Sequence, residues 1–205
     1  MPRKDSLRTY RKKRDFGKTT EPEGESVPSA PAGAPQPRRV FVIQKHDATA
    51  LHYDFRLEVD GILKSWAVPK GPSLDPRQRR LAMPTEDHPM DYATFEGVIP
   101  KGQYGAGPVI VWDAGVYHNL EVDPRGKEVP MAKCVEQGRV EVLLTGRKIV
   151  GAFALVRAGT DPRGRARWLM IKMKDQHADA RRHPVSSKPR SVLSDRTIEQ
   201  VARGK

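Results

Sequence analysis

Residues 51–59 read LHYDFRLEV, and the strict alternation of apolar and polar side chains in this stretch decides the fold class. Successive side chains of a β-strand point to opposite faces, so one face packs on a core while the other presents imidazole, carboxylate and guanidinium groups. Asp60-Gly61 follows at once and is typical of a type I′ turn, and ILKSWAVP at 62–69 supplies the returning strand. The stretch therefore predicts a β-hairpin with polar chemistry on one face.

Short strand-like runs recur between turn signals along the rest of the chain. Many short strands at this spacing indicate an antiparallel barrel or sandwich, and we expect a mainly β protein, a compact antiparallel β-barrel with a few short flanking helices. The expected helices are Met131–Gln137, which Gly138 ends, and a segment from the cap Ser194 to Ala202. The expected strands are residues 39–45, 51–59, 62–68, 79–83, 108–113, 138–146, 151–158 and 167–174.

The composition divides the chain into four parts. Residues 1–21 form a basic N-terminal arm that we expect to contribute to the substrate site, and residues 22–37 form a flexible linker rich in Pro, Ala and Gly. Residues 38–175 hold the strand runs and form the barrel. Residues 176–205 form a polar C-terminal tail that lies over the barrel or leads out of it.

The charge balance favours a polyanionic partner. The chain carries 37 Lys and Arg against 25 Asp and Glu, a net charge of +12, and clustered cations bind nucleic-acid backbones by releasing counterions. A basic but inert surface is the alternative interpretation. The single cysteine, Cys134, excludes an internal disulfide, and no apolar run has the length of a membrane span. We expect a cytoplasmic, nucleoid-associated protein without membrane contact.

A metal site is the strongest chemical hypothesis. His46 precedes His52 by six residues, so a bend at 47–50 brings both imidazoles beside Asp54, and such a set binds a divalent ion with positions left open. Arg56 follows on the same strand face and can hold an anion beside the ion. The alternative is that these groups lie on an ordinary solvated strand face. The ligand set does not select the metal, since Zn²⁺ or Cu²⁺ intrinsically binds more tightly than Mn²⁺.

Further residues could contact phosphate. His88 can neutralise a phosphate oxygen as imidazolium or protonate a leaving oxygen, and Tyr92 can donate a hydrogen bond. Lys70 and Arg80 add cationic donors. His88 could instead be an ordinary loop residue, and Lys70 and Arg80 could be ordinary surface residues. The glycine-rich stretch 97–107 is interpreted as a tight structural loop.

The sequence resembles the 3′-phosphoesterase domain found in bacterial DNA ligase D and as small stand-alone proteins. The resemblance implies a Mn²⁺-dependent β-barrel enzyme, with Co²⁺ or Zn²⁺ as other possible occupants of its site. It implies removal of a 3′-terminal ribonucleoside from a DNA primer-template and then of the 3′-phosphate, which leaves a 3′-hydroxyl. DNA ligase, polymerase and Ku-type end-joining proteins are the implied partners. The matching stretches are residues 10–22, 41–76, 86–97, 99–107 and 168–175.

The resemblance also implies roles for particular residues. The metal ligands are His46, His52 and Asp54. The catalytic residues are Arg56, His88, Tyr92, Lys70 and Arg80. The substrate-binding residues are Arg14, Asp15, Glu21, Gln44 and Glu86, of which the first three belong to an arm used mainly in ribonucleoside removal. Lys101 and Gln103 depart from the family pattern, where acidic residues are expected.

Two other functions fit the same residues. A non-catalytic DNA-end-binding module would use the basic residues alone and would give salt-sensitive binding without product. A non-haem Fe(II) oxygenase would use His52, Asp54 and His88 as its two-histidine, one-carboxylate ligands, and its turnover would be coupled to O₂.

Overall fold

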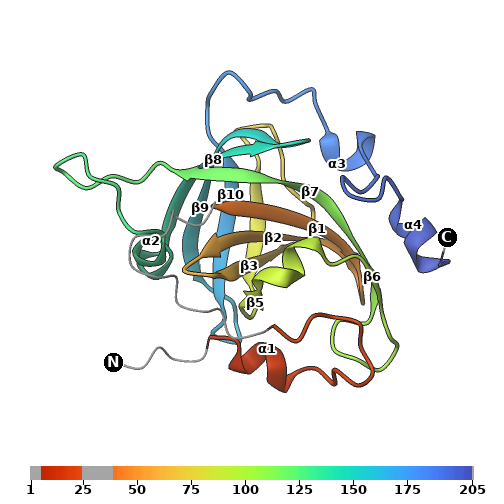
Figure 1. The fold of residues 1–205 in the computed structure, drawn as a ribbon. Helices are drawn as coiled ribbons and strands as arrows, with labels where there is room; N and C mark the ends of the chain where they lie inside the picture. Colours follow the sequence, from red (N-terminus) through yellow and green to blue (C-terminus); the bar gives the residue numbers. More distant parts are fainter. Residues whose placement is uncertain (1–5, 25–38, 205) are drawn as a thin grey trace.

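The structure, a computed structural model, describes residues 6–24 and 39–204 and consists mainly of β-strands (Figure 1). Of the expected linker, residues 25–37 lie outside this description. The strands are β1 (Val40–Asp47), β2 (Leu51–Val59), β3 (Ile62–Val68), β4 (Arg79–Pro84), β5 (His88–Pro89), β6 (Gly97–Ile99), β7 (Gly107–Asn119), β8 (Arg139–Gly146), β9 (Val150–Thr160) and β10 (Ala166–Lys172). The helices are α1 (Arg8–Lys12), the 3-10 helix η1 (Met90–Thr94), α2 (Met131–Gln137), α3 (Pro184–Ser187) and α4 (Ile198–Ala202).

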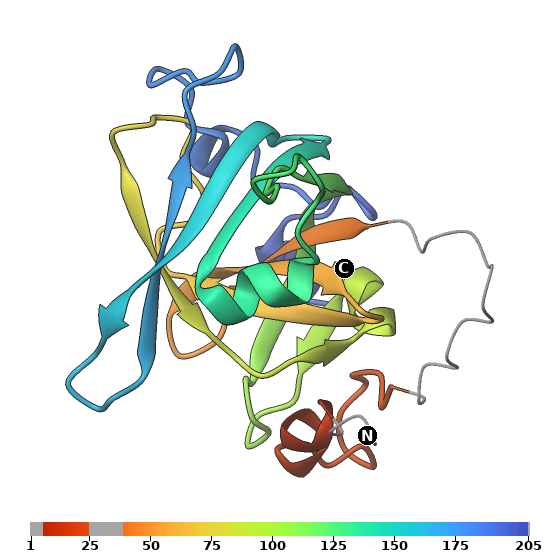
Figure 2. The same cartoon turned by 90° about the vertical axis from the view of Figure 1, so that its left-hand side faces the viewer.

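The strands close into an antiparallel barrel. Neighbouring strands follow the order β1-β2-β3-β4-β10-β9-β8-β7, and β7 pairs back onto β1, so that eight strands form a ring (Figures 1 and 2). The short strands β6 and β5 are added at β7 and β3. The expected compact antiparallel β-barrel with few short helices is confirmed.

Alternate residues of the barrel strands fill its interior. Tyr53, Phe55, Leu57 and Val59 of β2 belong to the main buried cluster, together with all three tryptophans. The opposite face of β2 is buried as well, because a second apolar cluster covers the outside of the wall. That cluster joins the N-terminal arm, β3, η1, β6 and β7 through Tyr10, Leu63, Tyr92, Phe95, Ile99 and Val109.

Two turn expectations are confirmed and one helix start is wrong. Asp60 and Gly61 have φ values of 53° and 84°, as a type I′ turn requires, and Gly138 ends α2 in the left-handed conformation. The last helix begins at Ile198 rather than after Ser194. Its cap is Thr197, which forms a reciprocal capping box with Gln200.

The C-terminal segment packs along the barrel. Trp112 Nε1 of β7 donates to the carbonyl of Lys188 at 2.7 Å, and Ile198 and Val201 of α4 form a small buried cluster with Ile110. None of the helices among residues 6–24 and 39–204 is long and apolar enough to cross a bilayer. The outer face of β1 to β3, covered by the arm and η1, is where the candidate site lies.

Candidate metal and phosphate site

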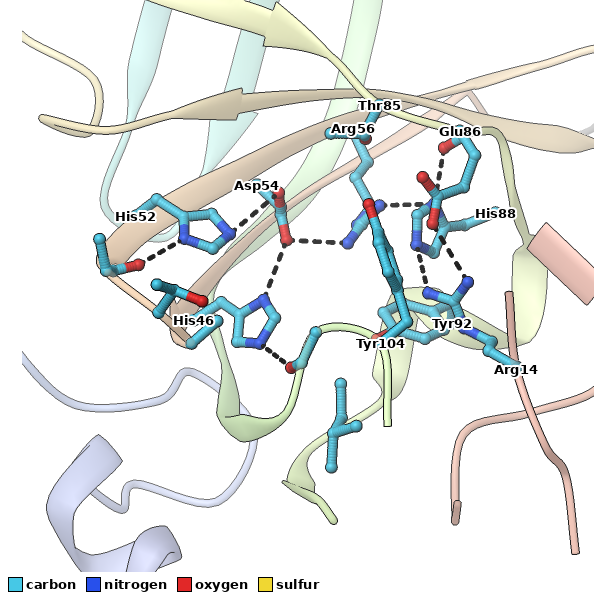
Figure 3. Close-up of a pocket in the computed structure, with 15 residues that line it drawn as sticks. Arg14, His46, His52, Asp54, Arg56, Thr85, Glu86, His88, Tyr92 and Tyr104 are labelled. Atoms are coloured by element: carbon cyan, nitrogen blue, oxygen red, sulfur yellow. Dashed lines mark hydrogen bonds and ion pairs between the residues drawn. The ribbon is translucent and has the colours of Figure 1, made fainter. Parts of the chain in front are cut away.

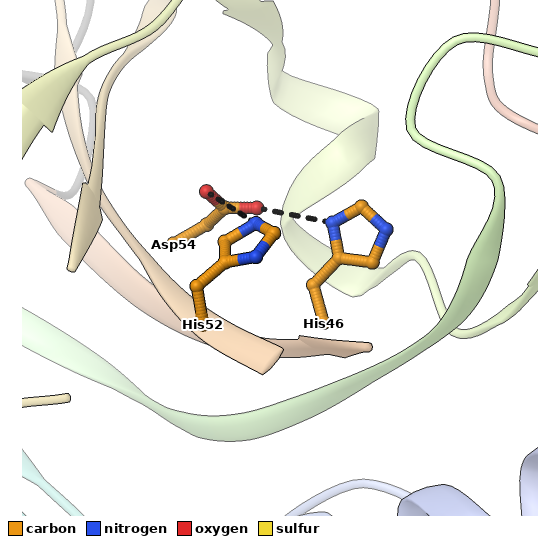
Figure 4. Close-up of side chains that lie close together, drawn as sticks. All are labelled: His46, His52 and Asp54. Carbon is orange, nitrogen blue, oxygen red and sulfur yellow. Dashed lines mark ion pairs between the residues drawn. The ribbon is translucent and has the colours of Figure 1, made fainter. Parts of the chain in front are cut away.

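The register of the β1–β2 hairpin brings the three expected ligands together. His46 is paired with His52, and Gln44 with Asp54, so the polar side chains of both strands share one face (Figure 4). Within the described residues, His46, His52 and Asp54 offer ligand atoms that all lie within 4.8 Å of one another. This face is opposite the main core, so the cluster lies on the outside of the barrel wall near the hairpin turn.

Backbone carbonyls fix the orientation of both imidazoles. His46 Nε2 lies 2.7 Å from the carbonyl oxygen of Gly105, and His52 Nδ1 lies 2.8 Å from that of Ala50, so these nitrogens carry the protons. The other two nitrogens, His46 Nδ1 and His52 Nε2, each lie 3.7 Å from an oxygen of Asp54. Two nitrogen lone pairs and a carboxylate thus converge without a proton between them. This donor set fits a divalent transition-metal ion.

Arg56 connects the metal cluster to the rest of the pocket. Its Nη2 donates to Asp54 Oδ2 at 3.0 Å, its Nε to Gln44 Oε1 at 2.7 Å and its Nη1 to Ser65 Oγ at 2.9 Å. Burial opposes ionisation of Asp54, but the Arg56 guanidinium holds the pKa of this carboxyl below its usual range. A guanidinium has five N–H donors, so one N–H on Nη2 remains for a ligand. The alternative, an ordinary solvated strand face, does not fit, because Asp54 and Arg56 are buried.

His88 is a neutral ring in the free protein. Burial, and then the cations Arg56 and Arg14, lower the pKa of His88 well below its ordinary value. Its Nδ1 lies 2.8 Å from the carbonyl oxygen of Glu86, which needs a donor, and its Nε2 lies 3.3 Å from Arg14 Nη2, which needs an acceptor. These contacts favour the Nδ1–H tautomer, although Arg56 Nη1 also lies 2.8 Å from Nδ1. The ring therefore presents a lone pair, rather than a charge, at Nε2.

The N-terminal arm inserts a cation into the same pocket (Figure 3). Arg14 donates from Nε to Glu21 Oε1 at 2.8 Å and from Nη1 to Glu86 Oε1 at 3.1 Å, and all three side chains are almost fully buried. Lys13 makes a second contact with Glu86 at 2.9 Å. Although burial disfavours its charge, the hydrogen bonds from Lys13 and Arg14 hold the pKa of Glu86 below its usual value. The arm is thus tied to the barrel by ion pairs inside the site.

Tyr92 joins the arm to the wall beneath it. Its hydroxyl donates to Glu21 Oε1 at 2.9 Å, and its carbonyl accepts from Gln44 Nε2 at 3.0 Å. Burial and the neighbouring carboxylate of Glu21 raise the pKa of Tyr92 well above its ordinary value, so the hydroxyl remains a donor. The Arg56 guanidinium lies 4.9 Å from the centre of the Tyr92 ring.

The structure brings most, but not all, of the expected site residues together. A cavity of about 330 Å³ is lined by eight of them. They are Arg14, His46, His52, Asp54, Arg56, Glu86, His88 and Tyr92. Gln44 and Glu21 stand directly behind this lining through the contacts described above.

Three expected residues lie elsewhere. Lys70 and Arg80 line a different cavity. Asp15 is at the surface, where it forms an ion pair with Lys18 at 2.8 Å.

Seven lining residues were not expected as site residues from the sequence: Ala48, Thr49, Ala50, Thr85, Ile99, Tyr104 and Gly105. Tyr104 and Gly105 come from the glycine-rich loop, which was interpreted as structural only, and Thr85 precedes Glu86. The Thr85 hydroxyl is buried without a hydrogen-bond partner among the described residues, so it is available to a ligand. One feature of the sequence could have indicated a functional role for this loop. It is Tyr104, a tyrosine among glycines, because an aromatic ring in such a loop has little core to pack on and is exposed.

Comparison with known proteins fixes the family. The family model of the DNA Ligase D 3′-phosphoesterase domain matches residues 44–157. The chain belongs to this family. The matched span contains the three ligands together with Arg56 and His88, whereas the arm and the C-terminal segment lie outside it.

Curated relatives extend the similarity beyond that span. "Multifunctional non-homologous end joining protein LigD" of Pseudomonas aeruginosa is 47% identical over 201 residues, which cover 97% of this chain and 22% of the relative. "Multifunctional non-homologous end joining DNA repair protein LigD" of Mycobacterium tuberculosis is 45% identical over 177 residues, which cover 85% of this chain and 21% of the relative. The chain therefore spans about a fifth of the length of these relatives.

The geometry of the phosphoesterase-family site excludes the oxygenase ligand set. That set needs His88 beside His52 and Asp54, but His88 is not part of the metal cluster of the described residues. Arg56 separates them, with one amino group on Asp54 and the other beside His88. Asp54 and His88 cannot bind the same metal ion while the positively charged Arg56 lies between them.

Proposed function

We propose that this chain is a metal-dependent DNA 3′-end-processing phosphoesterase, in keeping with the DNA-repair end-processing role of its family. It hydrolyses the phosphodiester that joins a 3′-terminal ribonucleoside to a primer strand, which leaves a 3′-phosphate. It then hydrolyses that phosphate to leave a 3′-hydroxyl for ligation. The proposal rests mainly on the position of Arg56. Its guanidinium contacts Asp54 of the three-ligand cluster on one side and His88 on the other, and all of these residues line the same cavity as Arg14.

The charges of the chain itself explain why a metal ion is needed. Arg56 is matched by Asp54, and Arg14 by Glu21 and Glu86, so the guanidiniums of the pocket leave little net positive charge. When bound at His46, His52 and Asp54, a divalent ion, which we propose to be Mn²⁺, supplies net positive charge and Lewis acidity for a phosphate oxygen.

The side chains around the cluster then have distinct tasks. The remaining N–H of Arg56 and the guanidinium of Arg14 bind the non-reacting phosphate oxygens and stabilise charge that develops on them. Neutral His88 holds Arg14 at its Nε2 atom, and this nitrogen can accept a proton. Gln44 and Ser65 orient Arg56, because each holds one of its nitrogens from the side away from the pocket.

The proposal extends to the setting of the reaction. The names of the relatives refer to non-homologous end joining and DNA repair. We therefore propose that primer-template 3′ ends of the nucleoid are the substrate, and that DNA ligase, polymerase and Ku-type end-joining proteins are the partners.

The decisive experiment follows a labelled primer-template that bears a single 3′-ribonucleotide, incubated with the protein in Mn²⁺ or in EDTA. We expect a ladder from the ribonucleotide end to the 3′-phosphate and then to the 3′-hydroxyl in Mn²⁺ only. His52→Ala should abolish both steps, whereas His118→Ala, at an exposed position of β7, should retain them. Full activity of purified His52→Ala would remove the cluster from the mechanism. Salt-sensitive binding by the wild-type protein without any product would instead favour the end-binding module.

A further inference from the structure

A second cavity, of about 200 Å³, lies between the loop after β3, strand β4 and the segment around α3. Among the described residues that line it, the ionisable ones are Lys70, Arg80, Arg182 and His183, and none is a carboxylate. It shares no lining residue with the metal and phosphate cavity. It is therefore a separate site with a strongly cationic lining.

Two segments far apart in the sequence build this cavity by close packing. A Cβ on Gly71, whose φ is +65°, would lie 2.8 Å from Val185 Cγ2 and 2.9 Å from Tyr53 Cδ2. Val185 also packs against the main core, and the Tyr53 hydroxyl donates to its carbonyl at 3.4 Å. The C-terminal segment is thus seated on the barrel at this point, and it carries Arg182 and His183 to the rim of the cavity.

Arg80 supplies a buried donor that lacks a partner. It lies on the same face of β4 as Ala82, which is part of the main core, so its side chain is at the end of the barrel interior. The Arg80 Nε atom is buried and has no hydrogen-bond partner among the described residues. Buried N–H groups of charged side chains are normally satisfied, so this atom points to a missing acceptor.

The neighbouring carboxylates are already engaged by other arginines. Asp75 accepts from Arg77 Nε and Nη2, each at 3.0 Å, and Asp179 accepts from Arg181 Nε at 3.0 Å and Nη2 at 3.2 Å. In the part of the chain that the structure describes, neither Lys70 nor Arg182 forms an ion pair with an acid. The cavity therefore keeps an excess of positive charge that an anion can neutralise.

We propose that this cavity binds a backbone phosphate of the DNA substrate, away from the phosphate that reacts. The inference rests on the proposed function for the nature of the substrate. Tyr53 is paired with Val68, so the cavity and His52 lie at the same end of the β2–β3 hairpin, and one nucleic-acid strand can pass both. Lys70 and Arg80, which the resemblance places among the catalytic residues, then act in binding, together with Arg182 and His183.

The test measures binding of a primer-template duplex that ends in a 3′-hydroxyl, in EDTA, by fluorescence anisotropy at several salt concentrations. This ligand needs neither metal nor turnover. Loss of one phosphate contact reduces the slope of log K against log[salt] by about one and weakens binding about eightfold near 0.1 M salt. We expect this effect for Arg182→Ala and for Lys70→Ala. Arg181→Ala is the matched control, because Arg181 is an exposed neighbour paired with Asp179 and lies outside the cavity lining.

Each result separates this inference from the function on which it rests. Slopes for Arg182→Ala and Lys70→Ala equal to that of Arg181→Ala would overturn the phosphate site, whatever the catalytic assay shows. Altered binding of inorganic phosphate by calorimetry, with DNA binding unaltered, would assign the cavity to a free anion and overturn the DNA assignment. Absence of salt-sensitive DNA binding by the wild-type protein would contradict the proposed function itself.

Discussion

At the scale of single residues, the site depends on how its buried charged groups are paired. For His88, which lies beside two cations, the effect can be measured as a dependence of stability on pH. The ring is buried between two guanidiniums, and burial and these cations lower its pKa well below 6.5. In the unfolded chain the ring takes up a proton at about pH 6.5. Between the two pKa values the unfolded state binds more protons, so the free energy of unfolding falls as the pH falls through this window.

We predict that the wild-type free energy of unfolding, measured by urea denaturation in EDTA, falls from about pH 7 to about pH 5.5. This single group contributes at most about 1.4 kcal/mol per pH unit. The lowered pKa values of Asp54 and Glu86 affect stability only at more acidic pH, because their unfolded values lie near 4. His88→Gln should flatten the profile, and His118→Gln, at an exposed position, should keep the wild-type slope. A wild-type slope in His88→Gln would show that the ring is not held neutral by burial.

The grouping of the three expected ligands could be predicted from the sequence, but their surroundings could not. Period-two alternation places His52, Asp54 and Arg56 on one strand face, and a turn between paired strands brings His46 opposite His52. The carbonyls that orient the imidazoles come from Ala50, inside the hairpin turn, and from Gly105, in a distant loop. Pairings across such sequence distances depend on the closed fold, which local patterns do not encode.

At the scale of elements, the N-terminal arm determines what the pocket can hold. Glu21 accepts hydrogen bonds from Arg14 and Thr19 of the arm and from Tyr92 of η1. It therefore connects the arm to the wall of the barrel. Without this carboxylate, Arg14 would lose one of the two acids it pairs with, and the Tyr92 hydroxyl would be left buried without its acceptor. Loss of a hydrogen bond to a charged group costs about 1.5–3 kcal/mol, so the arm would be held less tightly against the barrel.

We predict that Glu21→Ala slows ribonucleoside removal by about tenfold or more, because we propose that this step uses the arm over the longer substrate. Phosphate removal should fall less. The measurement compares initial rates on primer-templates that end in a ribonucleotide or in a 3′-phosphate, with limited proteolysis of residues 6–24 as a second readout. Glu23→Ala removes the same charge from an exposed position of the same segment and should change neither rate. Equal losses in both reactions for Glu21→Ala would contradict a step-specific arm.

Elements that nearby residues specify were predicted more closely than elements that form by pairing with distant strands. The residues of β2, β3 and α2 agree with the sequence expectation, because a period-two pattern, a type I′ turn and a terminal glycine specify them. Strand β7 extends from Gly107 to Asn119, well beyond the expected 108–113, because it pairs with β1, β6 and β8 in turn. The short strands β5 and β6 exist only through such partners, so no local signal revealed them.

At the scale of the whole molecule, the closure of the barrel lies next to the metal cluster, and one close backbone contact joins the two. Strand β7 reaches β1 where the ligand hairpin turns, and Gly107 lies against the backbone of Asp47. A Cβ on Gly107 would lie 2.0 Å from the carbonyl oxygen of Asp47 and 3.2 Å from Ala48 Cα. Both neighbours are backbone atoms close to His46, so relief of this clash shifts either the chain beside this ligand or the loop whose Gly105 carbonyl orients it.

We predict that Gly107→Ala both destabilises the fold and weakens Mn²⁺ binding. Gly102→Ala is the matched control, since Gly102 has a φ of +89° in the same loop but a Cβ added there would meet no neighbouring atom within 4 Å. The backbone penalty at Gly102 is about 1–2 kcal/mol, whereas Gly107, with a φ of +140°, lies further from the left-handed region that side chains tolerate, and only Gly107→Ala adds the clash. Urea denaturation should therefore give a larger loss for Gly107→Ala, and electron paramagnetic resonance titration should give weaker Mn²⁺ binding for that variant alone. If Gly102→Ala weakened Mn²⁺ binding equally, general loop strain rather than the Gly107–Asp47 contact would position the ligand hairpin.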